Sequence, residues 1–500
     1  MSFLRNAGFN FFGALLPAIA LFVTIPVIVH RLGADAYGAL VLITSIVGYF
    51  GIVDVNATAG SVKYVAEYKA SGQQIKANEV VTFGLLLYGA IGTLGAIALW
   101  FGAGPLVRGV FKVPDAWRDE AELALHVSAF AFFASQLQLY FQSIPQALQR
   151  FDLSGKLDAL FGSLIPLVTI AVVLGGGGLV AIVSARFAVS LVHCGCLVVV
   201  LRKLMPQYRP LWPTRATMGK VSSFSAFAYL QRLASITYMN ADKLMIGAQH
   251  SMLALAPYVI PYTLVSRVFG MLYRLTQSVF PMASAMAANG EIGELQRKYI
   301  YAKRYTVYLN ACTCLTFALF SQELLHFWLG GALGPTAPLI VVIVAYSLFL
   351  ESLTNIPSMV NDGLGRPHIT GVAALLRVAL GLAGAWWALL HYGIVALALT
   401  QLLVSAVMSI GFLVLIHRWS LPWTLAAVAR RVYIPGAGVL MVGSVAVVWR
   451  AGHAPMTGGE FTGTLVTLTV VLAAIGWTAV LSAEHRLRLL SVLNRRLGRI

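Results

Sequence analysis

VVTFGLLLYGAIGTLGAIALWFGA, residues 80–103, contains no charged side chain. A helix of about 20 apolar residues is long enough to cross the hydrocarbon core of a bilayer, which is about 30 Å thick. Apolar runs of similar length recur on both sides of this one, from Phe9 almost to the end of the chain. The sequence therefore predicts an all-α integral membrane protein.

The composition supports this fold class. Hydrophobic residues make up 59% of the 500 residues, charged residues make up 11%, and the mean hydropathy is +0.81. Ordinary soluble domains carry about 25% charged residues, so a soluble globule is excluded. The formal net charge of +17 comes from short basic clusters with few aromatic residues between them, which is not the pattern of a nucleic-acid-binding face. Function is expected within or beside the bilayer.

About fourteen spans are predicted along the chain. They cover residues 9–30, 37–58, 80–103, 121–148, 159–175, 177–201, 222–248, 253–286, 305–329, 338–360, 369–391, 393–416, 433–449 and 462–482. This series gives a first set of six helices in region 1–205, a second set of six in region 216–417, and two additional helices in region 430–482. A basic amphipathic tail follows at 483–500, and we expect it to lie on anionic lipid or to dock a partner.

The distribution of Lys and Arg among the loops predicts the orientation. Loops on one side carry most of these residues, whereas the other side carries only Arg31, Arg108, Lys112, Arg118 and Arg450. Positive charge is retained on the cytoplasmic side of a membrane. Both termini are therefore predicted to be cytoplasmic.

Six basic residues remain inside predicted spans: Arg186, Arg232, Lys243, Arg267, Arg274 and Arg377. A charge near the bilayer centre costs about 3 kcal/mol or more, so such groups should face water, a counter-ion or a substrate. Arg267 and Arg274 are seven residues apart and share one helix face. Because a guanidinium presents a planar fork to phosphate oxygens, the six residues are candidate ligands for a phosphate-bearing substrate.

A structural role is the alternative for each of these residues, through pairing with acids or snorkelling to an interface. Lys243 follows Asp242, so a local ion pair would satisfy it. Arg186 and Arg377 are isolated on their helices, and both interpretations stay open for them.

The acidic residues Asp54, Asp242 and Glu351 lie well within predicted spans, and Glu323 lies nearer the end of one. Intramembrane carboxylates bind a driving ion or neutralise buried arginines. Both roles are open for Asp54 and Glu351, whereas Asp242 fits a structural role better. The four cysteines form two C-x-C pairs whose members diverge around a helix, which does not suit a metal. No metal, cofactor or catalytic group is predicted.

Helix breakers and small residues add local expectations. Prolines that permit kinks lie in the first, eighth and tenth predicted spans, at Pro17, Pro26, Pro257, Pro261 and Pro357. The glycine steps at Gly89, Gly92 and Gly95 favour close helix packing.

Several short motifs appear in a characteristic order. They are Arg5-Asn6 with Asn10, LGADAYG at 32–38, GIVDVNATAGSVKYVAEY at 51–68, QRFD at 149–152, YMNADKLMIG at 238–247, VFPMASAMAANGE at 279–291 and NDGLGRPHI at 361–369. Their order over nearly the whole chain resembles the Wzx-type polysaccharide and O-antigen flippases. These flippases form the polysaccharide biosynthesis branch of the multidrug/oligosaccharidyl-lipid/polysaccharide exporter superfamily.

The resemblance implies two six-helix lobes around a central cavity, two additional C-terminal helices, and alternating access across a bacterial inner membrane. The substrate would be an undecaprenyl-diphosphate-linked oligosaccharide, with a proton or sodium ion as coupling ion and a polysaccharide polymerase as partner. Related lipid II flippases hold the diphosphate with cavity arginines, and Arg232, Arg267 and Arg274 lie on matching helices. The first helix departs from that pattern, since it carries no arginine after Arg5.

Three other classes of function are alternatives. A drug or cation antiporter would share the architecture but would favour acids and aromatic residues in its cavity. A membrane glycosyltransferase or polymerase needs acid and base groups on a substrate-facing loop, and no outer loop is long enough to build such a site. A scaffold without transport would not need six basic residues inside spans.

Overall fold

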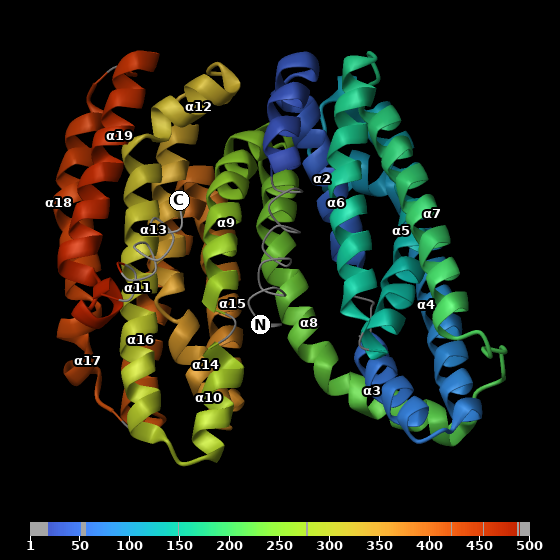
Figure 1. Cartoon of the computed structure of the whole chain (residues 1–500). Helices are drawn as coiled ribbons and strands as arrows, with labels where there is room; N and C mark the ends of the chain where they lie inside the picture. Colours follow the sequence, from blue (N-terminus) through green and yellow to red (C-terminus); the bar gives the residue numbers. More distant parts are fainter. Residues whose placement is uncertain are drawn as a thin grey trace, which may run out of the picture. The chain divides into compact units, whose positions relative to one another are not determined.

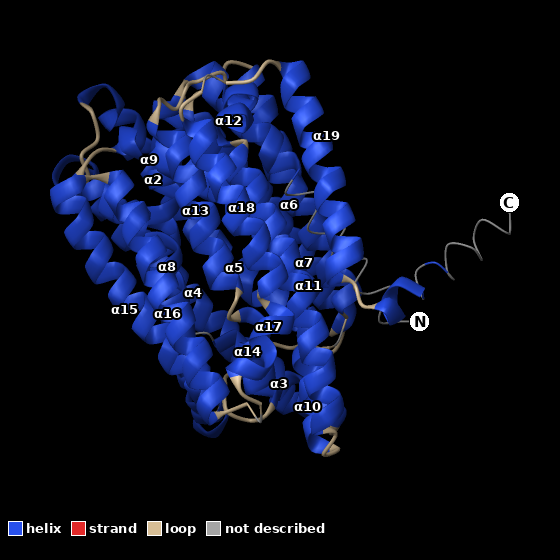
Figure 2. Cartoon of the chain, turned by 90° about the vertical axis from the view of Figure 1, so that its left-hand side faces the viewer, coloured by secondary structure: helices blue, strands red, loops and turns tan. Residues whose placement is uncertain are grey.

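The structure is a computed structural model, and it describes residues 19–51, 57–148, 150–276, 279–421, 423–453, 455–487 and 490. These residues form helices joined by turns, with no strand among them (Figure 2). Nine helices of the described part are long and apolar enough to cross a membrane, and three shorter apolar helices accompany them at Ile19–Leu32, Ala34–Phe50 and Gly438–Arg450. The prediction of an all-helical membrane protein is confirmed, whereas the count of fourteen spans stays a prediction.

The chain divides into two compact units. Unit 1 consists of Met1–Ile260 with Ala385–Ile394, and unit 2 consists of Pro261–Gly384 with Val395–Ile500. The end of α15 (Pro367–Tyr392) belongs to unit 1, and there the Nε2 atom of His250 lies 2.9 Å from the carbonyl oxygen of Leu389. Helix α8 also packs within unit 1, against α2 and α3. The lobe boundaries drawn from the sequence stay a prediction.

Unit 1 is built from long helices that pack side by side (Figure 1). In chain order these are α2 (Ala34–Phe50), α3 (Ala57–Ala70), α4 (Gln74–Pro105) with its π-turn Leu106–Val110, α5 (Asp115–Ala147), α6 (Phe151–Leu174), α7 (Leu179–Leu204) and α8 (Arg215–Gln249), then the turn Met252–Ala254 and the start of α9 (Leu255–Thr276). Helix α5 packs against both α4 and α7. A buried core forms where these helices meet, and in it the rings of Tyr88 and Tyr140 stack with centroids 5.4 Å apart.

Unit 2 is centred on α11, which contacts α13, α17 and α18. Its helices are the remainder of α9, then α10 (Val279–Ala288), α11 (Ile292–Leu319), α12 (Ser321–Leu329), α13 (Thr336–Ser352), α14 (Asn355–Gly363), α15, α16 (Ile394–Trp419), α17 (Leu425–Val432), α18 (Ile434–Ala451) and α19 (Gly458–Ile475) with its π-turn Gly476–Val480. The predicted span 338–360 is divided between α13 and α14, at Leu353 and Thr354. The predicted span 305–329 is divided between α11 and α12.

Glycine allows close approach of helices in both units. A Cβ atom added at Gly84 would lie 2.1 Å from the ring of Tyr140, and one at Gly95 would lie 2.2 Å from the ring of Phe132. Gly92 also lies against α5, whereas nothing lies within 4 Å of the corresponding position at Gly89. Two of the three predicted glycine steps therefore serve helix packing, as expected.

We predict that Gly84→Ala destabilises the protein, because its methyl group overlaps the buried ring of Tyr140. Overpacking of this kind costs about 1–3 kcal/mol. Gly89→Ala is the matched control on the same helix and should be neutral or slightly stabilising, since alanine is the better helix former. Thermal unfolding of both variants in detergent tests this, and equal melting temperatures would contradict the packing argument.

Candidate substrate-binding site

Arg186 of α7 lies inside unit 1. Its Nε atom donates a hydrogen bond to the Oγ1 atom of Thr169 on α6, at 3.0 Å. Arg186 is half-buried, and Thr169 is fully buried. The contact joins two neighbouring helices of one unit, which is the arrangement that a structural role requires.

Lys243 lies near the end of α8 and forms an ion pair with Asp242, as their adjacent positions in the sequence suggest. Its ammonium nitrogen is 3.3 Å from the Oδ1 atom of Asp242, and both side chains are largely buried. The hydroxyl of Tyr258 donates to the other carboxylate oxygen of Asp242, at 3.1 Å. Asp242 therefore links the end of α8 to the beginning of α9 inside unit 1.

Arg377 lies inside unit 2, where it joins three helices. Its Nη1 atom is 2.8 Å from the Oε1 atom of Glu351 on α13, and its Nη2 atom donates to the hydroxyl of Ser409 on α16, at 2.9 Å. The exposed fractions of the two charged side chains are 14% and 27%. The pair neutralises Arg377 and holds α15 to α13 and α16.

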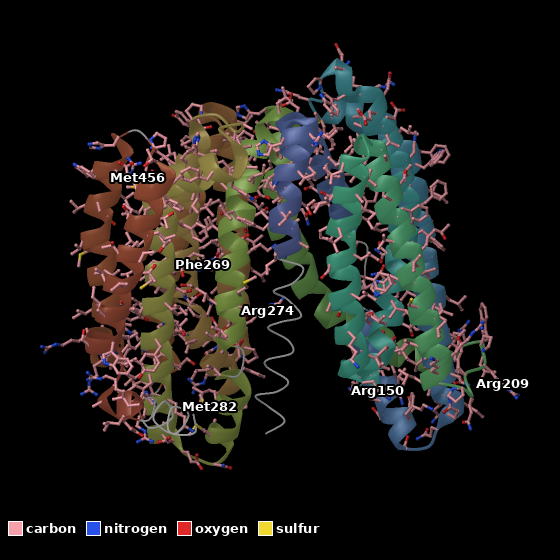
Figure 3. All side chains as sticks on the ribbon, turned by 45° about the horizontal axis from the view of Figure 1, so that its top comes forward. Arg150, Arg209, Phe269, Arg274, Met282 and Met456 are labelled. Carbon is pink, nitrogen blue, oxygen red and sulfur yellow. The ribbon has the colours of Figure 1, made fainter. Side chains whose placement is uncertain are left out.

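Arg267 and Arg274 differ from these residues. Both side chains are exposed on unit 2, on the part of α9 that follows Pro261. Among the described residues, neither makes a side-chain hydrogen bond or an ion pair. In Figure 3, Arg274 projects from α9 on the side away from Phe269, whose ring is buried. Arg267 and Arg274 therefore form an exposed cationic face on α9, and the role of this face in substrate binding stays a prediction.

Two predicted site residues cannot be placed. Asp54 lies outside the described residues, and the same is true of the end of the basic tail. Arg232 lies in α8, but its side chain is outside what the structure describes. The roles predicted for Asp54 and Arg232 stay predictions.

Two buried cations lie at positions where the hydropathy of the sequence predicts loops. Arg450, predicted on the outer side, ends α18 and forms a buried ion pair with Glu323 of α12. Lys303, predicted in an inner loop, is 2% exposed in α11 and donates a hydrogen bond to the carbonyl oxygen of Leu353, where α13 ends. Helical spacing could have revealed Lys303, since it continues the buried series formed by Leu295 and Tyr299.

An apolar groove of about 710 Å³ runs along unit 2. Residues from three helices line it: Val268 of α9, Tyr308 and Thr316 of α11, and Leu472 and Trp477 at the end of α19. Val268 follows Arg267 directly and lies about 100° farther around the axis of α9, so the groove opens on a different side of this helix from the two arginines. Such a groove accommodates a hydrocarbon chain better than a polar molecule.

The chain is similar to several known membrane proteins. The family model described as "Polysaccharide biosynthesis protein" matches residues 27–338. A Shigella flexneri protein named as an O-antigen transporter is 18% identical over 80% of this chain and 94% of its own length. A Rhizobium meliloti protein named as the multidrug resistance protein NorM is 24% identical over 76% of this chain and 84% of its own length.

The solved structure of the lipid II flippase MurJ, in an inward closed conformation, shares the fold. It superposes with a TM-score of 0.69 and 12% sequence identity, over 95% of this chain and 99% of that one.

We predict that Glu351→Gln lowers stability by about 1–3 kcal/mol, because it leaves the partly buried charge of Arg377 without its carboxylate. Arg274→Gln should change stability by less than about 0.5 kcal/mol, since Arg274 is exposed and makes no pair among the described residues. Melting temperatures of both variants in the same detergent provide the measurement. A loss for Arg274→Gln as large as that for Glu351→Gln would show that Arg274 has an internal role.

Proposed function

Since this chain belongs to the polysaccharide biosynthesis protein family, we propose that it moves a lipid-linked oligosaccharide across the bacterial inner membrane. One relative is named as an O-antigen transporter, and a protein of the same fold is a lipid II flippase. The substrate is an undecaprenyl-diphosphate-linked oligosaccharide that passes from the cytoplasmic to the outer leaflet for assembly of a surface polysaccharide. The chain performs no covalent chemistry in this proposal, and both of its termini are cytoplasmic.

The open cationic face of α9 carries the proposal. Arg267 and Arg274 lie within a helix that is apolar enough to span a membrane, yet they are exposed and make no internal pair among the described residues. An arginine that faced lipid there would cost about 3 kcal/mol or more, so an aqueous cavity or an anion is the better partner. Two guanidinium forks on one helix face suit the oxygens of a diphosphate.

A groove that opens on another side of α9 supports a lipid substrate. Its lining of residues such as Val268, Leu472 and Trp477 is largely apolar, so it can hold part of a hydrocarbon chain while the headgroup binds the arginines. We propose that two lobes rock around a central cavity, so that the charged headgroup crosses the membrane while the tail stays in the bilayer. Arg232 is expected to add a third cation.

Arg186, Lys243 and Arg377, whose partners lie within the protein, have a structural role in this proposal. Arg377 and Lys243 have carboxylates as partners, and Arg186 has a hydroxyl group. A phosphate could reach Arg377 only by competing with Glu351. We therefore place first contact with the headgroup at Arg267 and Arg274, and assign the other three to the walls that hold the helices in position.

We predict that Arg267→Ala and Arg274→Ala each reduce translocation by roughly tenfold or more while the protein still inserts into the membrane. A hydrogen bond to a charged group contributes about 1.5–3 kcal/mol, and 1.4 kcal/mol corresponds to a factor of ten. Surface-polysaccharide display in cells that carry each variant is the measurement, with membrane fractions checked for the protein.

Arg297→Ala is the control for this experiment. Arg297 is also an exposed arginine of unit 2, but it pairs with Glu294 in the first turn of α11 and its hydrogen bond and charge lower the pKa of that carboxyl. Display should be normal in this variant. Normal display in a variant with both Arg267 and Arg274 replaced would remove the proposed site.

We also predict that Asp54→Asn weakens the dependence of transport on the driving ion, because an intramembrane carboxylate is a group that binds a proton or sodium ion. Transport in vesicles under imposed proton and sodium gradients tests this. A response to both gradients that matches the unaltered protein would exclude Asp54 as the coupling site.

The similarity to NorM favours a drug or cation antiporter as the second candidate. The exposed charges on α9 are positive, which repels an organic cation and attracts an anion. Growth of drug-sensitive cells that produce the protein separates the two candidates, since an antiporter raises drug resistance and a dedicated oligosaccharide flippase does not.

A further inference from the structure

The segment that joins α7 to α8 is fastened to α4 of the same unit. This segment, residues 205–214, is the strap. The side-chain amide of Asn78 donates to the carbonyl oxygen of Gln207 at 3.3 Å, and the backbone N–H of Leu211 donates to the hydroxyl of Thr82 at 3.2 Å. The hydroxyls of Thr82 and Tyr208 are 3.1 Å apart. The strap therefore has a fixed course along the first turns of α4.

A buried carboxylate holds the end of the strap. Glu79 is 8% exposed, and its Oε2 atom accepts hydrogen bonds from the hydroxyls of Thr214 and Thr217, at 2.9 and 2.6 Å. Thr214 is also the N-cap of α8. Glu79 belongs to α4, but its carboxylate contacts the first residues of α8. It therefore supplies the negative charge that a helix N-terminus favours.

The exposed side of the strap is basic and aromatic. Trp212 is 82% exposed, and it stands between Pro210 and Pro213, which restrict the backbone. Arg209 and Arg215 are exposed on either side of it, and Figure 3 shows Arg209 projecting outward from unit 1. No Asp or Glu occurs anywhere between residues 159 and 241.

Structural roles do not explain these side chains. Neither Arg209 nor Arg215 has an ion-pair partner among the described residues. Arg215 is in the first turn of α8, where positive charge is unfavourable to the helix. Trp212 leaves most of its indole outside the protein. An external partner with negative charge and an apolar side would satisfy all three residues.

The depth of the strap along α4 identifies that partner. Thr82 is about 12 Å along the helix from Gln74, at a rise of about 1.5 Å per residue. The apolar sequence Phe83 to Leu87 follows directly, so the strap lies beside the polar-to-apolar boundary of a predicted span. Tryptophan is enriched at this depth of a membrane, and basic side chains there bind anionic headgroups.

We propose that the strap and Arg215 form a binding site for anionic phospholipid, with the Trp212 indole among the headgroups and the guanidinium groups of Arg209 and Arg215 on lipid phosphate. The site is separate from the cationic face of α9 and does not depend on the substrate that the protein moves. Its place beside α4, α7 and α8 anchors unit 1 to one leaflet.

The first test measures lipid binding to the purified full chain in detergent that contains equal parts of phosphatidylglycerol and phosphatidylcholine. Native mass spectrometry counts the lipids that remain bound. Because each basic residue near an anionic surface contributes to binding, the Arg209→Gln/Arg215→Gln double variant should lose roughly tenfold or more in phosphatidylglycerol affinity and leave phosphatidylcholine binding unchanged.

The matched control is Arg108→Gln/Arg118→Gln, since these two exposed arginines already pair with Asp119, Glu122 and Asp115. The control should bind phosphatidylglycerol as the unaltered protein does. An equal loss in both double variants would mean that net charge alone attracts lipid, and no loss in the strap variant would overturn the site.

The second test locates Trp212. The full chain and its Trp212→Phe variant are reconstituted in vesicles of phosphatidylcholine and phosphatidylglycerol brominated on the acyl chains close to the headgroup. The difference in fluorescence between the two proteins reports Trp212, and it should be quenched by the brominated lipid. Quenching by iodide in the aqueous phase with none by the lipid would show that the strap faces water and would favour a soluble partner over the bilayer.

Discussion

A charge inside a bilayer must have a partner, and this requirement organises both units of the protein. Glu351 balances Arg377, Asp242 balances Lys243, and Glu323 balances Arg450. The first and third pairs join different helices, so neutralisation and packing are achieved there by the same side chains, whereas Asp242 and Lys243 are neighbours on α8. The two arginines of α9 stand apart, since they gain no such partner among the described residues. Their positive charge is left for something that is not part of the helix bundle.

Close helix packing gives each unit the stiffness that a transporter needs. Gly84 and Gly95 bring α4 against the rings of α5, and Gly443 does the same for α18 against Leu315 of α11. Interiors packed at this distance resist small deformations and move as bodies. Motion is therefore expected between units more than within them, which is the kind of motion that alternating access requires.

The sequence predicts the helices well because hydrophobic length is a local property, readable in stretches such as 80–103. It predicts helix breaks less well. At the division of span 338–360, Lys303 of another helix donates to the carbonyl oxygen of Leu353 where α13 ends, a contact between residues that are far apart in sequence. Ion pairs such as Arg450 with Glu323 were missed for the same reason, since they are separated by more than one hundred positions.

The pair of Lys243 and Asp242 was foreseen because its members are adjacent. The open arginines were identified by their spacing of seven, although the sequence alone could not separate them from Arg377, whose partner lies on a different helix.

The distribution of paired and open cations also bears on the nature of the substrate. A protein that exported organic cations would gain nothing from exposed guanidinium groups on a membrane-spanning helix, because they would repel the substrate at short range. Exposed arginines on a helix that also lines an apolar groove suit the proposed substrate, which has an anionic head and a long hydrocarbon tail. The strap shows the same combination at an exposed surface of unit 1, where Trp212 and Arg209 belong to a segment whose end is held by Glu79. The two proposals thus share one chemical principle, in which arginine with an apolar neighbour binds a phosphate that is attached to a lipid.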